Sequence, residues 1–180
     1  MRILSFLRTF IKKPKEVSAF IPTLRRVAES IVNYIPLSAN LVVEYGPGNG
    51  VVTKKILEHL APDSKVIAIE ILDEFVDDLK KINDPRLKVV KGNVLQKSLD
   101  LSEESVDVIL SSIPLSRLEK NERRKLIEVS AKALKSGGKM IIYYQTSKLS
   151  LPILENIFKE VEWHFDPRNF TPYFILIAKK

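Results

Sequence analysis

After residue 40, short apolar runs alternate with segments in which apolar residues recur at spacings of three and four. Short apolar runs predict strands at residues 41–45, 65–70, 87–92, 106–112 and 139–145, with two closing strands at 161–165 and 173–180. Apolar spacings of three and four predict intervening helices at 53–60, 72–82, 119–135 and 153–158. This alternation predicts an α/β fold with a doubly wound, Rossmann-like, seven-stranded sheet that is mostly parallel and has an antiparallel final strand. Gly137 and Gly138 are expected to end the third helix as a left-handed cap.

The segment before residue 37 has a different pattern. In residues 1–13, six large apolar side chains share one side of a helix and basic side chains share the other, and Pro14 ends that helix. A second helix has Leu24, Val27, Ala28, Ile31 and Ile35 on one face. We therefore divide the chain into an N-terminal amphipathic helical segment, residues 1–36, and a main domain, residues 37–180.

The composition limits the kinds of functional site and partner that the chain can have. Cysteine is absent, which excludes disulfides and thiolate catalysis, and the two histidines lie far apart in sequence, so no metal site is expected. No apolar run is long enough to span a membrane, and the N-terminus does not resemble a secretory signal. A net charge of +7 favours an anionic partner, either nucleic acid or a membrane surface, although a lysine-rich surface without such a partner has the same charge.

Three glycines follow the first strand in the pattern Glu44-x-Gly46-x-Gly48-x-Gly50. A glycine turn at the carboxyl end of a parallel strand lets a ligand approach the backbone closely, although a tight turn without a ligand would also use glycine. The pattern resembles the first motif of class I S-adenosylmethionine-dependent methyltransferases. This resemblance implies S-adenosylmethionine as the cofactor and residues 37–180 as its binding domain.

The resemblance assigns further residues to the cofactor. Glu70 would accept hydrogen bonds from the ribose, and the alternative is that it is a charge at a helix N-terminus. Asn93 would meet the adenine or else shape a turn. Glu44 either faces the ligand or holds the glycine turn. The other positions that the resemblance assigns to the cofactor are Ile71, Val94, Ser111, Phe20 and Thr23.

The residues after the fourth strand, Ser111 to Leu115, correspond to the part of this superfamily that lines the methyl-acceptor site. Ribosomal RNA adenine dimethylases carry Asn-Leu-Pro-Tyr there, and their tyrosine stacks on the flipped base. This chain has Ser112 and Leu115 at the asparagine and tyrosine positions, so the aromatic platform is absent. Pro114 belongs to the same segment, or to an ordinary strand exit.

The whole chain is similar to bacterial phospholipid N-methyltransferases, which methylate phosphatidylethanolamine toward phosphatidylcholine. The similarity rests on "SAFIPT" at 18–23, "VEYGPGNGVVT" at 43–53 and "SSIPL" at 111–115. The first stretch also resembles the "QNFL" segment of the RNA dimethylases, and "RNFTPYFILI" keeps one of the two prolines of a further family motif. The lipid resemblance implies that residues 1–13 bind an anionic membrane surface, with the protein cytoplasmic and peripheral at the inner face. The alternative is that this helix packs on the protein or mediates oligomerisation.

The implied reaction is attack of a headgroup amine on the activated methyl group. Ser112, Pro114 and Tyr144 are expected to line the acceptor site, and no general base is assigned among Glu16, Glu44 and Tyr144. Tyr143, Tyr144 and Tyr173 are candidates for cation-π contact with a methylated amine, with core packing as the alternative.

The other functions kept open are an rRNA adenine N6-dimethyltransferase, with nucleic acid as its partner, a small-molecule or protein methyltransferase, and a non-enzymatic binding module. The residues leave open which lipid is methylated, including ornithine-type amino lipids, and how many methyl groups are added.

Overall fold

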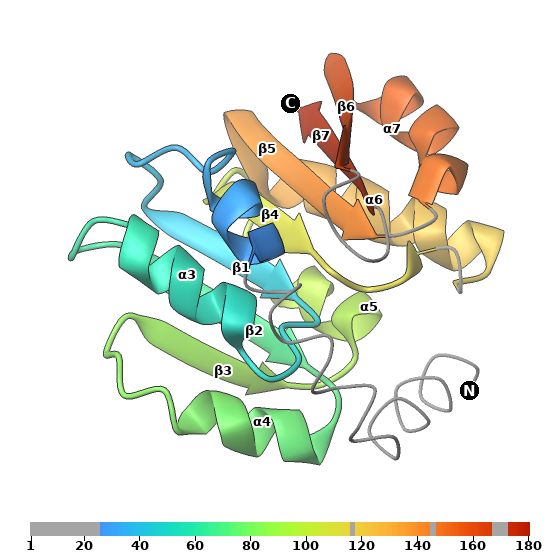
Figure 1. The fold of residues 1–180 in the computed structure, drawn as a ribbon. Helices are drawn as coiled ribbons and strands as arrows, with labels where there is room; N and C mark the ends of the chain where they lie inside the picture. Colours follow the sequence, from blue (N-terminus) through green and yellow to red (C-terminus); the bar gives the residue numbers. More distant parts are fainter. Residues whose placement is uncertain (1–25, 116–117, 145–146, 167–172) are drawn as a thin grey trace.

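The computed structural model describes residues 26–115, 118–144, 147–166 and 173–180. Its seven strands form one sheet in the order β3-β2-β1-β4-β5-β7-β6 (Figure 1). The strand bounds are β1 (Leu41–Tyr45), β2 (Lys65–Glu70), β3 (Leu87–Lys91), β4 (Val106–Ser111), β5 (Leu134–Tyr144), β6 (Glu160–Asp166) and β7 (Tyr173–Lys179).

The pairing confirms the predicted fold class. Parallel pairs join β1 to β2 and β4, β2 to β3, and β4 to β5. The final strand β7 pairs antiparallel with both of its neighbours, β5 and β6. The central strand β1 is almost entirely buried, which explains why its sequence is a continuous apolar run rather than an alternating one.

Helices cover both faces of the sheet (Figure 1). On one face, α3 (Val51–His59) and a helix at residues 26–32 share a core with alternate residues of the central strands, such as Val42 and Val108. On the other, α6 (Lys120–Ala133) and α7 (Leu151–Ile157) pack on Val43 and Ile109. Two further helices, α4 (Asp73–Lys80) and α5 (Val94–Lys97), follow β2 and β3. The period of two along each strand therefore divides the core into two layers.

The second predicted N-terminal helix packs in the main core. Val27, Ala28, Ile31 and Ile35 are all buried in the cluster that contains α3. The Nε2 atom of His59, at the end of α3, lies 2.8 Å from the carbonyl oxygen of Ile35. Leu24 and the amphipathic helix at 1–13 lie outside the described residues, and the division at residue 36 stays a prediction.

The prediction that Gly137 and Gly138 cap the third helix is wrong. The helix α6 already ends at Ala133, and β5 begins at Leu134, whose backbone is extended. Gly137 has a φ of 76° inside β5, where the pairing with β4 shifts register between Val106 and Val108. Glycine is needed at this irregularity because few other residues adopt such a backbone conformation without strain.

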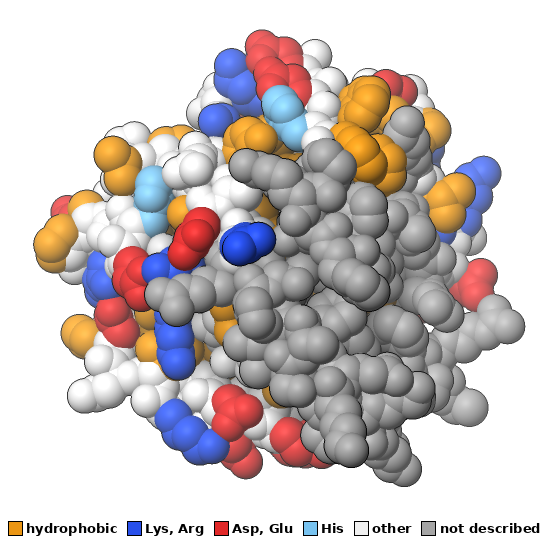
Figure 2. Space-filling model, in the orientation of Figure 1, with side chains coloured by type: hydrophobic (Ala, Val, Ile, Leu, Met, Phe, Trp, Pro, Cys, Tyr) orange, Lys and Arg blue, Asp and Glu red, His pale blue; other side chains and the backbone are white. Residues whose placement is uncertain are grey.

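The described surface carries charges of both signs. Figure 2 shows Lys and Arg side chains interspersed with Asp and Glu side chains over the described part of one face, so this part offers no continuous basic region. Among the described residues, every helix is too short or too polar to cross a bilayer.

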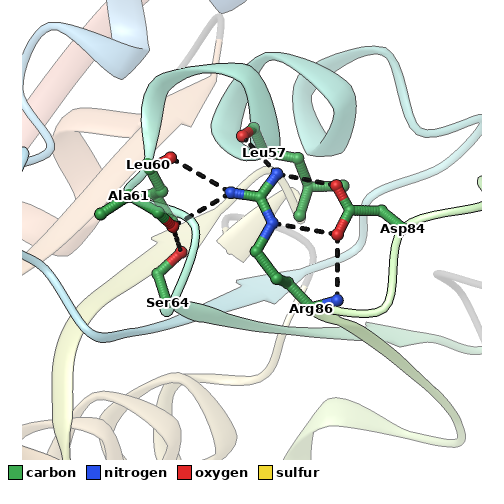
Figure 3. Close-up of polar contacts among 6 residues, drawn as sticks. All are labelled: Leu57, Leu60, Ala61, Ser64, Asp84 and Arg86. Atoms are coloured by element: carbon green, nitrogen blue, oxygen red, sulfur yellow. Dashed lines mark hydrogen bonds and ion pairs between the residues drawn. The ribbon is translucent and has the colours of Figure 1, made fainter.

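Arg86 links the end of α3 to the loop before β3 (Figure 3). Its guanidinium group donates hydrogen bonds to the carbonyl oxygens of Leu57, Leu60 and Ala61, at 2.8 to 3.1 Å. Asp84 holds the other side of the guanidinium group at 3.0 and 2.7 Å. These carbonyl groups lie at or just after a helix C-terminus, where the helix provides no N–H partners, so one planar side chain provides hydrogen bonds to all three. The Ala61 carbonyl oxygen also accepts hydrogen bonds from Ser64 N at 3.1 Å and Ser64 Oγ at 2.7 Å.

Replacing Arg86 by alanine is expected to lower the free energy of unfolding by about 3 kcal/mol, because several charge-assisted hydrogen bonds are lost together. Arg86→Lys should recover only part of this loss, since an ammonium group lacks the planar fork. Urea unfolding of both variants measures the effect. Lys81→Ala is the matched control, because Lys81 forms only an exposed ion pair with Asp78 and should change stability by about 0.5 kcal/mol or less. Equal losses in Arg86→Ala and Lys81→Ala would contradict the prediction.

Candidate active site

The sheet topology brings the predicted site segments together at its carboxyl edge. The strand order places β1 between β2 and β4, so the chain leaves the sheet in opposite directions on the two sides of β1. Such a point is where ligands bind in open α/β sheets. Backbone hydrogen bonds continue past the strands at this edge: Gly46 N donates to Ile69 O at 3.0 Å, and Gly92 N donates to Glu70 O at 2.8 Å.

The three motif glycines have different neighbours although all have positive φ angles of 58° to 79°. A Cβ atom on Gly46 would lie 2.5 Å from Ile113 Cγ2, and one on Gly50 would lie 2.9 Å from Ile82 Cδ1. A Cβ atom on Gly48 would meet no atom of the described residues within 4 Å. Two of the glycines are therefore required by packing as well as by backbone conformation, and the middle one borders the open space in which a ligand can approach the backbone.

Glu70 binds the glycine turn directly. Its Oε2 atom accepts a hydrogen bond from Gly48 N at 3.0 Å, and its Oε1 atom accepts from Ile71 N at 2.7 Å and Leu72 N at 3.0 Å. Glu70 is buried, and Leu72 is the residue that precedes α4. The carboxylate thus holds both the turn and the start of a helix, which agrees with the reading of Glu70 as a helix N-terminal charge. A carboxylate oxygen accepts two hydrogen bonds, so Oε2 keeps capacity for a ribose hydroxyl.

Glu44 is fully buried beneath the same turn. Its Oε2 atom accepts a hydrogen bond from Thr53 Oγ1 at 2.6 Å, and its Oε1 atom has no hydrogen-bond partner among the residues that the structure describes. Burial raises the pKa of Glu44 to about 7, the Thr53 hydrogen bond opposes the rise, and the nearby Glu70 charge adds to it. Sequence reasoning did not assign Thr53, although it stands in the first turn of the helix that follows the glycines.

Asn93 begins α5. Its Oδ1 atom accepts a hydrogen bond from Leu95 N at 2.8 Å, which is the geometry of a helix N-cap. The turn-shaping alternative is therefore present in the structure, and the Nδ2 group is the part of Asn93 that would meet an adenine. Val94 is partly buried in the first position of α5.

Ser112 turns its hydroxyl group into the glycine turn. Its Oγ atom hydrogen-bonds the carbonyl oxygens of Tyr45, at 3.0 Å, and Gly46. Ser111, by contrast, is fully buried, and within the described part of the chain its Oγ atom has no hydrogen-bond partner. Pro114 and Leu115 are buried as well. The segment after β4 is thus tightly packed against the turn rather than projecting from it.

The remaining predicted residues divide into two groups. Tyr143 is buried in the core on the α3 face, so core packing, the alternative to an acceptor role, is confirmed for it. Tyr144 ends β5, and its side chain lies outside the described residues, as does that of Tyr173. Phe20 and Thr23 also lie outside the described residues. Within the described part of the chain, no His, Cys, Asp and Glu side chains form a group of three that could hold a metal ion.

Together these residues fit a nucleoside cofactor that carries a cationic centre. The backbone at Gly48 is open, Glu70 keeps an acceptor site beside it, and Glu44 keeps an unpaired carboxylate oxygen beneath it. Buried carboxylate oxygens without hydrogen-bond donors are costly, and a positive ligand charge nearby would lower that cost.

Known proteins resemble the chain to different extents. It is 28% identical to an ornithine lipid N-methyltransferase of Singulisphaera acidiphila over 173 residues, which cover 93% of this chain and 90% of that protein. It is 31% identical to ribosomal RNA small subunit methyltransferase A of Mycoplasma mobile over 91 residues, covering 50% of this chain and 34% of that protein.

Solved structures confirm the fold. The crystal structure of a SAM-dependent methyltransferase from Archaeoglobus fulgidus aligns with a TM-score of 0.68 at 17% identity, covering 87% of this chain and 94% of that one. Residues 42–138, more than half of the chain, match the family model of a methyltransferase domain. The chain therefore belongs to this methyltransferase family, with S-adenosyl-L-methionine as its cofactor.

Proposed function

We propose that the protein transfers methyl groups to the headgroup amine of a membrane lipid. Phosphatidylethanolamine, converted toward phosphatidylcholine, and ornithine lipid both offer a primary amine of this kind. The observation that carries the proposal is the similarity to an ornithine lipid N-methyltransferase, which covers 93% of this chain. It extends beyond residues 42–138, which match the general methyltransferase domain.

The proposed cofactor site uses the groups at the carboxyl edge. The Gly48 backbone would contact the cofactor, Glu70 Oε2 would accept from the ribose, and Asn93 Nδ2 would meet the adenine. Glu44 Oε1 would balance positive charge on the ligand. Ile71, Val94, Ser111, Phe20 and Thr23 complete the proposed set on the strength of the family resemblance.

S-adenosyl-L-methionine supplies a methyl group that is already activated on a sulfonium. The protein therefore needs mainly to align the acceptor amine and to favour its unprotonated form. As the amine nitrogen forms its bond to the methyl carbon, the carbon–sulfur bond breaks and its electrons stay on sulfur. The proton lost by the ammonium passes to solvent, and partial desolvation of the amine lowers its pKa in the required direction.

The residues after β4 support a lipid amine over a flipped base. Leu115 is buried, with 1% of its surface exposed, and stands where the RNA dimethylases carry their stacking tyrosine. The Ser112 hydroxyl is bonded to the glycine turn. An aliphatic headgroup amine needs neither an aromatic platform nor an asparagine amide at these positions.

Apolar surface is also exposed at the end of β6, near the carboxyl end of β5. Phe165 is 49% exposed near the end of β6, and its ring centroid lies 5.1 Å from that of Phe174 in β7. Phe174 pairs with Tyr144 at the end of β5. Exposed aromatic side chains are common where proteins meet the membrane–water interface. This surface supports a peripheral position at the membrane, to which residues 1–13 would add basic contacts.

The proposed acceptor is tested by methyl transfer from labelled S-adenosyl-L-methionine. The enzyme is offered phosphatidylethanolamine or ornithine lipid in anionic liposomes, and undermethylated small-subunit ribosomal RNA, with the products resolved by mass spectrometry. Methylated lipid is expected, and the two lipid arms identify the headgroup. Dimethylated adenine without methylated lipid would overturn the proposal, and label in none of the three arms would place the acceptor outside both classes.

Gly48→Ala is expected to weaken S-adenosyl-L-methionine binding at least tenfold, because the added methyl group would enter the space proposed for the ligand. Gly137→Ala is the matched control, since Gly137 also has positive φ and open space around its missing Cβ. Both variants should lose about 1 kcal/mol of stability from the same backbone strain. Isothermal titration calorimetry should show weaker binding only for Gly48→Ala. Equal affinities would remove Gly48 from the cofactor site.

The ionisation of Glu44 predicts how stability depends on pH in the absence of cofactor. Its pKa of about 7 in the folded protein exceeds the ordinary value of 4.5, so the folded state holds this proton more tightly than the unfolded state does. The free energy of unfolding should therefore fall as pH rises from about 4.5 to about 7, by about 3 kcal/mol for this group. Glu44→Gln should remove this decrease, as measured by urea unfolding between pH 5 and 8. Parallel pH profiles for the parent and the variant would show that Glu44 is not the titrating group.

A further inference from the structure

Arg123 makes an unusual set of contacts in the first part of α6. Its Nε atom donates to Leu115 O at 2.9 Å, Nη2 donates to Leu118 O at 3.2 Å, and Nη1 donates to Leu149 O at 3.3 Å. A guanidinium group has five N–H donors in one plane and is suited to several acceptors that approach from different directions.

The three carbonyl groups come from two separate segments of the chain. Leu115 and Leu118 follow β4, and Leu149 belongs to η3 (Ser147–Ser150), which follows β5. Because β4 and β5 are adjacent and parallel, both segments leave the sheet at the same edge. We call the region between these two strand exits the acceptor edge, since it contains Ser112, Pro114 and the end of β5 at Tyr144.

The two segments differ in exposure at the residues that Arg123 contacts. Leu115 is buried among the residues beneath α6, whereas Leu149 exposes 60% of its surface, although the next residue, Ser150, is buried. The hydrogen bond from Arg123 to Leu149 O therefore connects the exposed part of η3 to a segment anchored in the core. Exposed parts of a turn open more easily than buried ones, so this hydrogen bond is expected to limit the movement of η3.

The partners of the Arg123 guanidinium group are these carbonyl oxygens. In the part of the chain that the structure describes, no carboxylate forms an ion pair with Arg123. The next residue, Arg124, does form one, with Glu128 at 3.3 Å along the exposed side of the helix. The two neighbouring arginines therefore have different structural partners although they have the same charge.

We propose that Arg123 is a positioning residue that holds the exits of β4 and β5 together and so sets the shape of the acceptor edge. It acts through the backbone of both segments and does not touch the cofactor or the reacting atoms. The assignment of this edge to the acceptor rests on the proposed function. The connection of the two segments through Arg123 rests on the three hydrogen bonds and does not depend on the proposed function.

The kinetic test compares Arg123→Gln with Arg124→Gln, which removes the same charge one residue further along. For Arg123→Gln we expect kcat/KM toward the lipid acceptor to fall at least tenfold, mainly through a higher acceptor KM, while the dissociation constant for S-adenosyl-L-methionine changes less than twofold. Arg124→Gln should leave both quantities within twofold of the parent. Arg123→Lys should be intermediate, because an ammonium group cannot reach all three carbonyl groups from one position.

A second measurement does not depend on the identity of the acceptor. Hydrogen exchange should be faster, by tenfold or more, both at Leu115 and Leu118 and in residues 147–151 of Arg123→Gln, and unchanged there in Arg124→Gln. If the parent methylates no lipid, the proposed function fails, and exchange alone decides whether Arg123 joins the two segments. Faster exchange in one segment only, or in neither, would overturn the proposal.

The two measurements also separate positioning from general stability. A variant that merely unfolds more easily would show faster exchange throughout, with unchanged kcat/KM per folded molecule, and that result would overturn the positioning role. Weaker S-adenosyl-L-methionine binding in proportion to the loss of kcat/KM would also overturn the positioning role, because the substitution would then act on cofactor binding rather than on the acceptor edge.

Discussion

The turn from β1 into α3 is the constraint on which the rest of the structure depends. The chain leaves a buried central strand and begins a helix at Val51, and it does so through three glycines at positive φ. The first and last of these allow Ile113 and Ile82 to pack where a side chain would collide. The turn also receives a hydrogen bond at Gly46 from Ser112, which follows β4, while Gly48 donates one to Glu70, which ends β2. The exits of three neighbouring strands are therefore joined at one point.

Two buried carboxylates beneath this turn explain why the site suits a cationic ligand. Glu70 is stabilised by three backbone N–H groups, so its charge is well compensated. Glu44 has one hydrogen bond and an oxygen without a partner, so its charged form is disfavoured near neutral pH. A protein pays in stability for such a group, and a positive ligand offsets that cost only when it is bound. The glycine turn thus provides space and the carboxylates beside it provide charge.

The acceptor edge is built by different means. Its residues are held by packing, as Leu115 is, and by hydrogen bonds from the guanidinium group of Arg123. Alignment of an amine with an activated methyl group requires defined geometry more than acid or base catalysis. Such an edge, shaped by hydrogen bonds to the backbone and bordered by the exposed Phe165, is what the proposed membrane-lipid acceptor would require.

Local periodicity was enough to predict all seven strands and the position of the glycine turn, because buried parallel strands and positive φ angles restrict which residue types can occur. The resemblance of the glycine motif to a known family, and not periodicity, indicated Glu44, Glu70 and Asn93 as candidate site residues. Local periodicity failed at Gly137, because the register of β5 against β4, and not the end of α6, requires glycine there.

Sequence alone determined the fold class, since it depends on patterns within a few neighbouring residues, and the resemblance of the glycine motif predicted the edge at which the cofactor would bind. Only the tertiary structure decided that Gly48 faces open space while Gly46 does not, that Glu70 binds the turn, and that Arg86 and Arg123 join distant loops. In the sequence both arginines are ordinary charged residues. Their partners are backbone carbonyl groups, which every residue possesses, so the choice among them is made by the packing that brings particular segments within hydrogen-bonding distance.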